Sequence, residues 1–196
     1  MEHLIDEIIG RIFIELEASG RHVHLSKGDA LTLFGHELTE KRPLSQPGQF
    51  VCNERVTIIG EKGRFENVAV LGPERGDTQV ELSLTDCVSL GVRAPVRQSG
   101  NTKDTPGVII EAGGKQLKLN GGVIVAQRHI HMTPADAKAR KLSDGQRVKL
   151  RTLTARPVIF EDVTVRVSPK FRTYAHLDYD EANACGFQKG DLGMIL

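Results

Sequence analysis

The chain contains an internal repeat, and this repeat limits what it can fold into. "RHVHLSKGDA" at residues 21–30 is matched by "RHIHMTPADA" at 128–137, an offset of 128 − 21 = 107. "FENVAVLGPERGDTQVELSLTDCVSLG" at 65–91 aligns without a gap to "FEDVTVRVSPKFRTYAHLDYDEANACG" at 160–186, an offset of 160 − 65 = 95. Between these blocks, "LSQPGQ" in the first half resembles "LSDGQ" in the second. Similar blocks in the same order indicate a duplication, so the two halves are expected to share one fold.

The repeated segments have the pattern of short β-strands. "RVTIIG", "ENVAVLG", "QRVKLRTL" and "EDVTVRVS" are rich in β-branched residues and are separated by turn residues. "SKGDALTLFG" and "TPADAKARKL" are predicted to be helices with Ser26 and Thr133 as N-caps. Many short strands and few helices predict a mainly β protein. We expect two similar small β-barrel domains that arose by duplication, each with short capping helices.

The predicted division of the chain follows the repeat. Residues 1–98 form the first barrel half, 99–107 a polar linker, and 108–196 the second barrel half. Residues 2–11 have the leucine and isoleucine spacing of a short amphipathic helix. It is either a cap packed on the chain's own body or a targeting helix. It runs directly into "FIELEAS" without a flexible linker, which favours the cap and a cytoplasmic location.

Charge and composition argue against several classes of protein. The formal net charge is +1 with 26% charged residues, which does not suggest a nucleic-acid groove or a membrane-binding patch. No stretch reaches the roughly 20 apolar residues that a membrane span requires. The three cysteines, Cys52, Cys87 and Cys185, form no CxxC motif and are expected to be small buried side chains rather than disulfide partners. We therefore predict neither nucleic acid nor membrane as a partner.

The repeated HxH motif is the strongest functional signal. Residues i and i+2 of a strand point to one face, so His22 lies beside His24, and His129 beside His131. A single HxH is more often an ordinary surface or core feature. Two copies at repeat-related positions indicate metal binding, since imidazole is a common ligand of zinc and similar ions.

The repeat also identifies a third ligand for each site. At the offset of 95, Glu81 in "QVELS" lies opposite His176 in "YAHLD". Alone, Glu81 could be a solvated residue and His176 a core histidine. Together they complete two predicted metal sites: His22, His24 and Glu81; and His129, His131 and His176. Nitrogen and oxygen donors suit Zn²⁺ without excluding other transition ions, and three protein ligands leave a position open for chemistry.

Several polar residues are candidates for the surroundings of these sites. Arg75 lies in the "GPERGD" loop, and its planar guanidinium suits a phosphate or carboxylate, although it could be an ordinary loop arginine. Gln79 shares a strand face with Glu81, and Arg166 interrupts the apolar run "VTVRVS". From the pattern alone, three further residues are plain turn or linker positions: Gln46, Gln49 and Ser99.

The chain resembles a known family. "SGRHVHLS", "LSQPGQF", "GPERGDTQVELSLTD", "GVRAPVRQSG", "GGVIVAQRHIHMTPADA" and "DEANACG" are similar to motifs of the PduL-type phosphate acyltransferases (phosphate propanoyltransferases), in order, from about residue 14 onward. The resemblance implies two β-barrel domains with two zinc ions between them. It implies exchange of an acyl group between coenzyme A and inorganic phosphate, with acyl-CoA and phosphate as partners.

The resemblance also implies roles for individual residues. The family's zinc motifs fall on the same six residues that the repeat selects, and its phosphate-binding arginine falls on Arg75. Polar active-site positions fall on Gln46, Gln49, Gln79, Ser99 and Arg166. Positions near coenzyme A fall on Ser19 and Asn183. One departure is Gly20, where members commonly have Asn; we expect a local change of turn and no lost ligand.

The expected activity is zinc-dependent transfer of a short acyl group, propanoyl or acetyl. A metal-dependent hydrolase of a thioester or phosphoester is the alternative within enzymes, and a non-catalytic metal-binding assembly module is the alternative outside them. A homodimer is expected. Since family members often carry an N-terminal helix that packs them into bacterial microcompartments, the microcompartment lumen, with shell or lumen proteins as partners, is the alternative location. The sequence leaves acyl length and reaction direction open.

Overall fold

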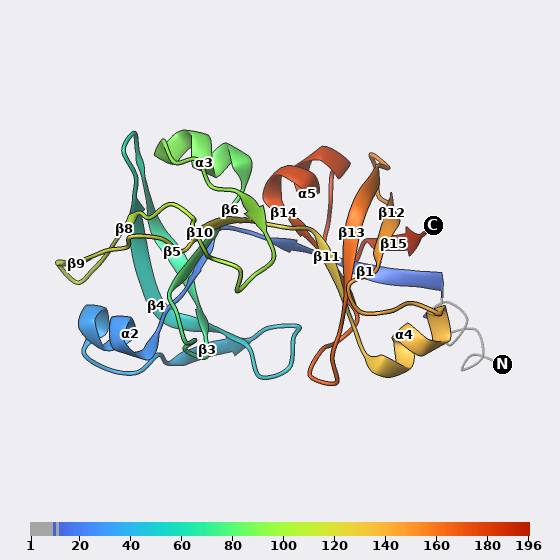
Figure 1. Cartoon of the computed structure of the whole chain (residues 1–196), viewed down its shortest axis with the longest axis horizontal. Coiled ribbons are helices and arrows are strands. Elements are labelled where there is room, and N and C mark those ends of the chain that lie inside the picture. The colour runs from blue at the N-terminus through green and yellow to red at the C-terminus, as the bar shows by residue number, and fades with distance from the viewer. Residues whose placement is uncertain (1–9, 11) are drawn as a thin grey trace. The chain divides into compact units, whose positions relative to one another are not determined.

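The computed structural model of the protein describes residue 10 and residues 12–196 (Figure 1). The described chain forms two compact units, one of residues 20–127 and one of residues 128–196 together with the strand Phe13–Ser19. Most of the structure is β, with one closed barrel and one curled sheet. This confirms the predicted mainly β class with two barrel-like domains. The predicted helix over residues 2–11 lies outside the described residues, except for Gly10.

The unit of residues 128–196 is a closed barrel of six strands among the described residues. Around the barrel, the strands are β1 (Phe13–Ser19), β14 (Tyr174–Asp178), β11 (His129–Met132), β13 (Ile159–Val167), β12 (Arg147–Leu153) and β15 (Leu192–Ile195). β1 closes it by pairing parallel to β14 and antiparallel to β15. Aliphatic side chains such as Leu16, Ile130 and Val165 fill the inside, and the helices are α4 (Pro134–Arg140) and α5 (Tyr179–Cys185).

The unit of residues 20–127 is a curled sheet that does not close in the described structure. Its strand order is β7 (Val96–Arg97), β10 (Val123–Ala126), β6 (Gln79–Leu82), β2 (His22–His24), β5 (Arg64–Gly72), β4 (Phe50–Ile59), β8 (Ile109–Ala112) and β9 (Lys115–Lys118), with β3 (Glu40–Pro43) paired to β4. The helices are α2 (Lys27–Phe34) and α3 (Leu84–Leu90). β7 and β9 are the edge strands of this sheet, whereas in the closed barrel β1 and β15 pair with each other.

Strand pairing reproduces the repeat. β2 pairs parallel to β5 and antiparallel to β6, and β11 pairs in the same way with β13 and β14. His22 lies opposite Glu81, and His129 lies opposite His176. The offsets of 107 and 95 found in the sequence therefore relate residues at the same place in two similar structures.

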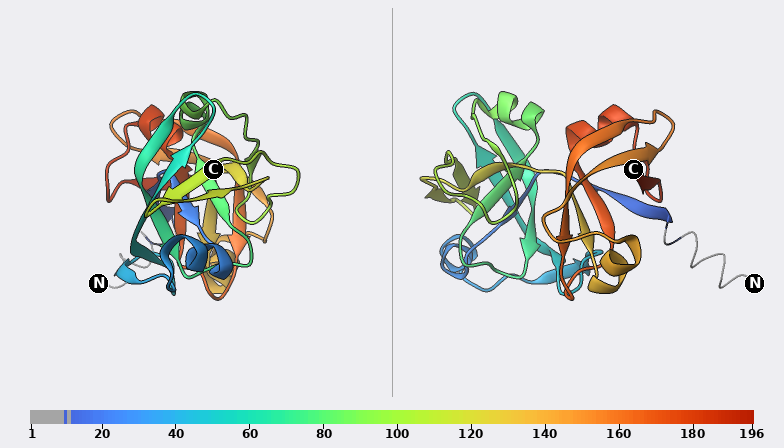
Figure 2. Two further views of the ribbon diagram at one scale, coloured as in Figure 1. Left: turned by 90° about the vertical axis from the view of Figure 1, so that its left-hand side faces the viewer. Right: turned by 45° about the vertical axis from the view of Figure 1, so that its right-hand side comes forward.

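The strand before each HxH motif belongs to the other repeat's unit. Val123 of β10 pairs with Val80, and Leu16 of β1 pairs with Ala175, so the offsets 123 − 16 = 107 and 175 − 80 = 95 hold here too. Figure 2 shows β1, in blue, among the orange and red strands of the barrel. A parallel neighbour cannot come from a tight hairpin, so it is drawn from a distant part of the chain.

The compact units and the predicted repeat halves have different bounds. The compact units differ from halves of residues 1–98 and 108–196, because β1 lies in the second unit and β10 in the first. Residues 99–107 lie within the unit of residues 20–127 rather than between the two units. The predicted halves remain a proposal about the duplication.

The arginine before each HxH motif anchors a helix. Arg21 pairs with Asp86 at 2.7 Å and lies 4.1 Å above the Phe65 ring. Arg128 pairs with Glu181, also at 2.7 Å. Asp86 is the N3 residue of the capping box at the start of α3, and Glu181 is the N3 residue of the capping box at the start of α5. Each arginine therefore links the HxH strand to the helix that follows Glu81 or His176.

The predicted helix caps are confirmed. The Ser26 hydroxyl accepts the Asp29 N–H, and the Thr133 hydroxyl accepts the Asp136 N–H, both at 3.1 Å. The cysteines are also as predicted, since all three are buried and free of disulfides. Burial raises the pKa of the Cys52 thiol to about 12. None of the described helices combines the length and the apolar character needed to cross a membrane.

Candidate metal centres

The first cluster consists of His22 and His24 on β2 and Glu81 on β6, all buried. Their ligand atoms lie within 4.8 Å of one another. The His22 Nε2 is 3.6 Å from Glu81 Oε2, and the His24 Nε2 is 3.8 Å from Glu81 Oε1. The extended backbone of β2 places the two imidazoles on one face, and the register of β6 brings the carboxylate to them. The three residues selected from the sequence therefore converge on one point.

Backbone carbonyls fix the tautomers of both histidines in this cluster. The Nδ1 of His22 is 2.8 Å from the Gly20 carbonyl oxygen, and the Nδ1 of His24 is 3.2 Å from that of Leu71. With Nδ1–H donating to these carbonyls, the Nε2 lone pairs face Glu81. Metal-binding histidines are usually held in this way. The carbonyl that contacts His22 comes from Gly20, the turn residue directly before Arg21.

Burial and the interactions among the ionisable groups shift the pKa values of this cluster. Burial disfavours a charged His22, but the Glu81 carboxylate more than offsets this and raises the His22 pKa. Burial, His22 and Arg75 together hold the pKa of His24 well below its usual value. Burial opposes ionisation of Glu81, yet His22, His24 and the Ser99 hydroxyl hold its pKa below the usual range. An ionised carboxylate and a neutral imidazole are the forms that bind metals, so the pKa shifts of Glu81 and His24 favour binding, whereas His22 has to release its proton to bind.

A hydrogen-bonded network surrounds Glu81. The Ser99 hydroxyl donates to Glu81 Oε1 at 2.7 Å and accepts from the Arg75 guanidinium at 2.8 Å. The Gln79 amide nitrogen donates to Glu81 at 2.6 Å and to Ser99 at 2.9 Å. The Gly100 N–H donates to the Gln79 oxygen at 2.7 Å, which sets the orientation of that amide. Three of the predicted polar residues, Arg75, Gln79 and Ser99, thus meet around one predicted ligand.

The backbone fixes the position of Arg75. Its N–H donates to the Leu25 carbonyl at 2.8 Å, and the residue forms an isolated parallel bridge with Ser26. Leu25 and Ser26 directly follow His24, so the arginine loop is attached to the histidine strand. The guanidinium is therefore held one hydroxyl group away from the Glu81 carboxylate.

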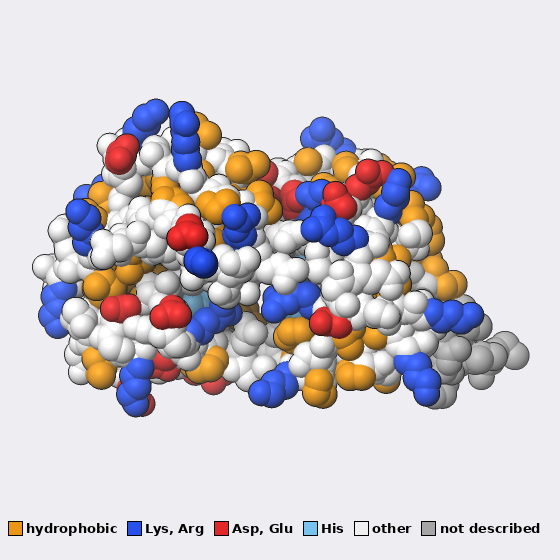
Figure 3. Space-filling model, viewed as in Figure 1, with side chains coloured by type: hydrophobic (Ala, Val, Ile, Leu, Met, Phe, Trp, Pro, Cys, Tyr) orange, Lys and Arg blue, Asp and Glu red, His pale blue; other side chains and the backbone are white. Residues whose placement is uncertain are grey.

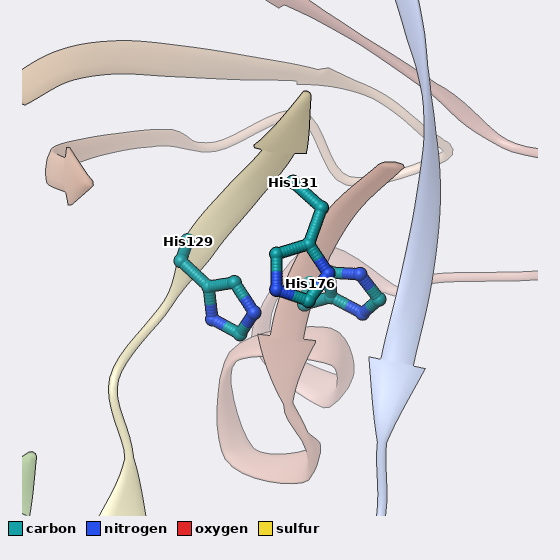
Figure 4. A group of neighbouring side chains, drawn as sticks. All are labelled: His129, His131 and His176. Atoms are coloured by element: carbon teal, nitrogen blue, oxygen red, sulfur yellow. The ribbon is translucent and has the colours of Figure 1, made fainter. Parts of the chain in front are cut away.

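The second cluster consists of His129 and His131 on β11 and His176 on β14 (Figure 4). The ring centroids are 4.5 Å apart for His129 and His131, 4.9 Å for His129 and His176, and 4.7 Å for His131 and His176. As in the first cluster, the ligand atoms lie within 4.8 Å of one another. Three imidazoles replace the two imidazoles and one carboxylate of the first cluster.

Arg166 and His131 of the second cluster both lie against the ring of Phe171. The Phe171 ring stacks on His131 with centroids 3.9 Å apart, and the Arg166 guanidinium lies 5.6 Å from the Phe171 centroid. Arg166 also lies opposite His131 in the β11–β13 register. The arginine that interrupts an apolar run in the sequence therefore lies near His131 of the cluster. Its chemical role remains a proposal.

One residue near the second cluster was not found from the sequence. The Glu17 carboxylate on β1 lies 3.3 Å from the His176 Nδ1. Glu17 alternates with apolar residues in "FIELEAS", which predicts a strand but not its neighbour. Only the pairing of β1 with β14 brings this carboxylate to the histidine.

The other predicted residues lie in places that do not by themselves define a role. Gln46 is buried, and its carbonyl accepts the Gln49 N–H at 3.2 Å within the turn before β4. Ser19 lies opposite Asp178, the N-cap of α5, and Asn183 is exposed on that helix. Their roles remain predictions. On the face shown in Figure 3, basic and acidic side chains are interspersed.

Comparison with known proteins relates the chain to one family. A model of the family described as "Phosphate propanoyltransferase" matches residues 15–188, which include both histidine clusters. A phosphate propanoyltransferase of Enterococcus faecalis is 53% identical over 204 residues, covering 100% of this chain and 97% of the relative. One of Listeria monocytogenes is 52% identical, covering 98% and 93%. One of Thermotoga maritima is 50% identical, covering 91% and 86%.

Proposed function

Because the chain belongs to the phosphate propanoyltransferase family, a family of transferases, we propose that it exchanges a short acyl group between coenzyme A and inorganic phosphate, using two zinc ions. The observation that carries this proposal is the network in which the Ser99 hydroxyl joins Arg75 to the carboxylate of Glu81, a proposed metal ligand. An anion-binding group beside a metal site suits a reaction whose second substrate is phosphate.

The residues of both clusters fit zinc. Each cluster offers three nitrogen or oxygen donors within 4.8 Å of one another, and a zinc ion held by three protein ligands would keep a coordination site open for substrate. The tautomers of His22 and His24 are already set for binding through Nε2. When bound, zinc ions would supply Lewis acidity that offsets negative charge on substrate oxygen and sulfur.

Arg75 is proposed to orient phosphate. Its guanidinium offers a planar pair of N–H donors, which matches two oxygens of a phosphate group. One nitrogen of the Arg75 guanidinium donates to the Ser99 hydroxyl at 2.8 Å, and the backbone contact to Leu25 holds the loop in place. Ser99 and Gln79 act on Glu81 and so keep the carboxylate oriented toward the histidines.

We propose direct transfer without an acyl-enzyme. A phosphate oxygen attacks the thioester carbonyl, the new C–O bond forms, the C–S bond breaks, and the phosphate proton ends on the coenzyme A thiol. Arg75 is placed to offset charge on the phosphate as the bond forms. All three cysteines are buried, and the raised pKa of Cys52 disfavours its thiolate, so the cysteines are poor candidates for a protein nucleophile.

A panel of acyl-CoA substrates, assayed with and without phosphate, tests this function. Release of coenzyme A should require phosphate and should match the acyl phosphate formed, with acetyl-CoA or propanoyl-CoA the best substrate. Acyl-labelled protein should not accumulate when phosphate is omitted. Hydrolysis without phosphate would instead support the metal-dependent hydrolase, and absence of coenzyme A binding would support the assembly module.

The assembly state and location are proposed from the sequence. We propose a homodimer, which a solution mass measurement checks, and a cytoplasmic location, with the microcompartment lumen as the alternative. Residues 1–18 fused to a fluorescent protein should give diffuse fluorescence in a compartment-forming cell. Discrete puncta that disappear in cells without the shell would contradict the cytoplasmic location and identify the segment as a targeting signal.

A further inference from the structure

We propose that Glu17 is a positioning residue of the second cluster: it accepts the Nδ1–H of His176 and so fixes the imidazole whose Nε2 binds the metal. The zinc part of this inference rests on the proposed function. The contact itself is a property of the chain.

The geometry supports this contact. Glu17 lies directly opposite His176 in the parallel pairing of β1 and β14, and its Oε2 is 3.3 Å from the His176 Nδ1. The His176 side chain is 11% exposed and that of Glu17 is 35% exposed. In Figure 4, the pale blue ribbon of β1 passes beside the three rings. The carboxylate thus reaches a mostly buried ring from a neighbouring strand, at the nitrogen opposite Nε2.

The first cluster shows what such a contact does. There, the Nδ1 atoms of His22 and His24 are held by backbone carbonyls. In the second cluster, a carboxylate takes this place for His176. A carboxylate that accepts the second N–H of a metal-binding imidazole fixes the tautomer of the ring and increases the basicity of the ring. Removing such a partner typically lowers metal affinity by about 10- to 100-fold.

The repeat indicates that Glu17 compensates for a change of ligand. The residue equivalent to Glu17 is Ile124, since 124 − 17 = 107, and Ile124 is fully buried opposite Glu81. Where the ligand is the carboxylate of Glu81, the neighbouring strand offers an apolar side chain. Where the ligand is the neutral ring of His176, the neighbouring strand offers a carboxylate. Each cluster therefore includes one carboxylate. Glu81 is itself a proposed metal ligand of the first cluster, whereas Glu17 contacts His176, a proposed metal ligand of the second.

Substitutions on β1 test the inference. Glu17→Ile installs the residue found at the equivalent position of the other repeat, and Glu17→Gln keeps an oxygen that can accept the Nδ1–H. Glu15→Gln is the matched control, because it removes the same charge from the same strand and Glu15 bonds Tyr174 instead of a ligand. Thermal melting of the metal-free variants should remain close to that of the parent.

Two readouts decide the result. In a zinc titration against a competing chelator, Glu17→Ile should lower the affinity for one of the two zinc ions by about 10- to 100-fold. Glu17→Gln should have a smaller effect, and Glu15→Gln should have none. In ¹⁵N NMR of the metal-free protein, His176 should be the Nδ1–H tautomer, and Glu17→Ile should mix the tautomers.

The outcomes separate this inference from the proposed function. An unchanged zinc affinity, or an equal loss at both sites, would overturn the role of Glu17 in a protein that binds two zinc ions. If the parent bound no zinc, the proposed cofactor would fail. In that case an unaltered His176 tautomer in Glu17→Ile would overturn the positioning role, and an altered one would support it.

Discussion

Glu81→Gln is expected to lower kcat by about 10³-fold, the upper range for removing one group that stabilises a transition state. The substitution keeps the size of the side chain but removes the negative charge that lies within 3.8 Å of both His22 and His24. It also places an amide in the network of Ser99 and Gln79, where the carboxylate now accepts two hydrogen bonds. Loss of a ligand and disorder of its surroundings should act together.

Steady-state kinetics and zinc content, measured on the same sample, check this expectation. Glu54→Gln is a suitable control, because Glu54 is another buried carboxylate of the same unit that accepts hydrogen bonds from Thr39, away from the cluster. The control should keep both zinc ions and its activity. If Glu81→Gln kept full activity and full zinc content, Glu81 would not be a ligand that the reaction needs.

Arg75→Lys is expected to raise the KM for phosphate by about 10- to 100-fold. This corresponds to the loss of one charge-assisted hydrogen bond, about 1.5–3 kcal/mol. Lysine keeps the charge but loses the planar pair of donors, and its shorter reach endangers the contact to Ser99. The KM for acyl-CoA should change much less, because the substitution removes binding to one substrate rather than to both.

The two KM values, measured by varying each substrate at saturating levels of the other, separate this role from general damage. Arg42→Lys, an exposed residue of β3, is the control and should behave as the parent protein. An unchanged phosphate KM in Arg75→Lys would remove Arg75 from the phosphate site. An equal rise in both KM values would indicate a displaced loop rather than a lost phosphate contact.

The sequence was sufficient to predict which residues cluster, because the repeat presents the same local pattern at two places in the chain. Strand alternation placed His22 beside His24, and a gap-free offset paired Glu81 with His176. The structure brings each set within 4.8 Å. The helix caps at Ser26 and Thr133 were likewise predictable, since a cap depends on only a few neighbouring residues.

What the sequence did not predict depends on contacts between distant segments. Strand pairing places β1 in the unit of the second HxH motif and β10 in the unit of the first. The hydrophobic pattern of a strand does not determine which strand pairs with it. Glu17 was missed for the same reason. Ser99 looked like an ordinary linker residue until folding placed its hydroxyl between Arg75 and Glu81. Side-chain networks of this kind are visible only in three dimensions.

Zinc content measured by elemental analysis on catalytically active protein tests the central claim most directly. About two zinc ions per chain are expected, one for each three-residue cluster. Removal of both by a chelator should abolish phosphate-dependent acyl transfer, and added zinc should restore it. A preparation that is active, free of metal and insensitive to chelators would contradict the account.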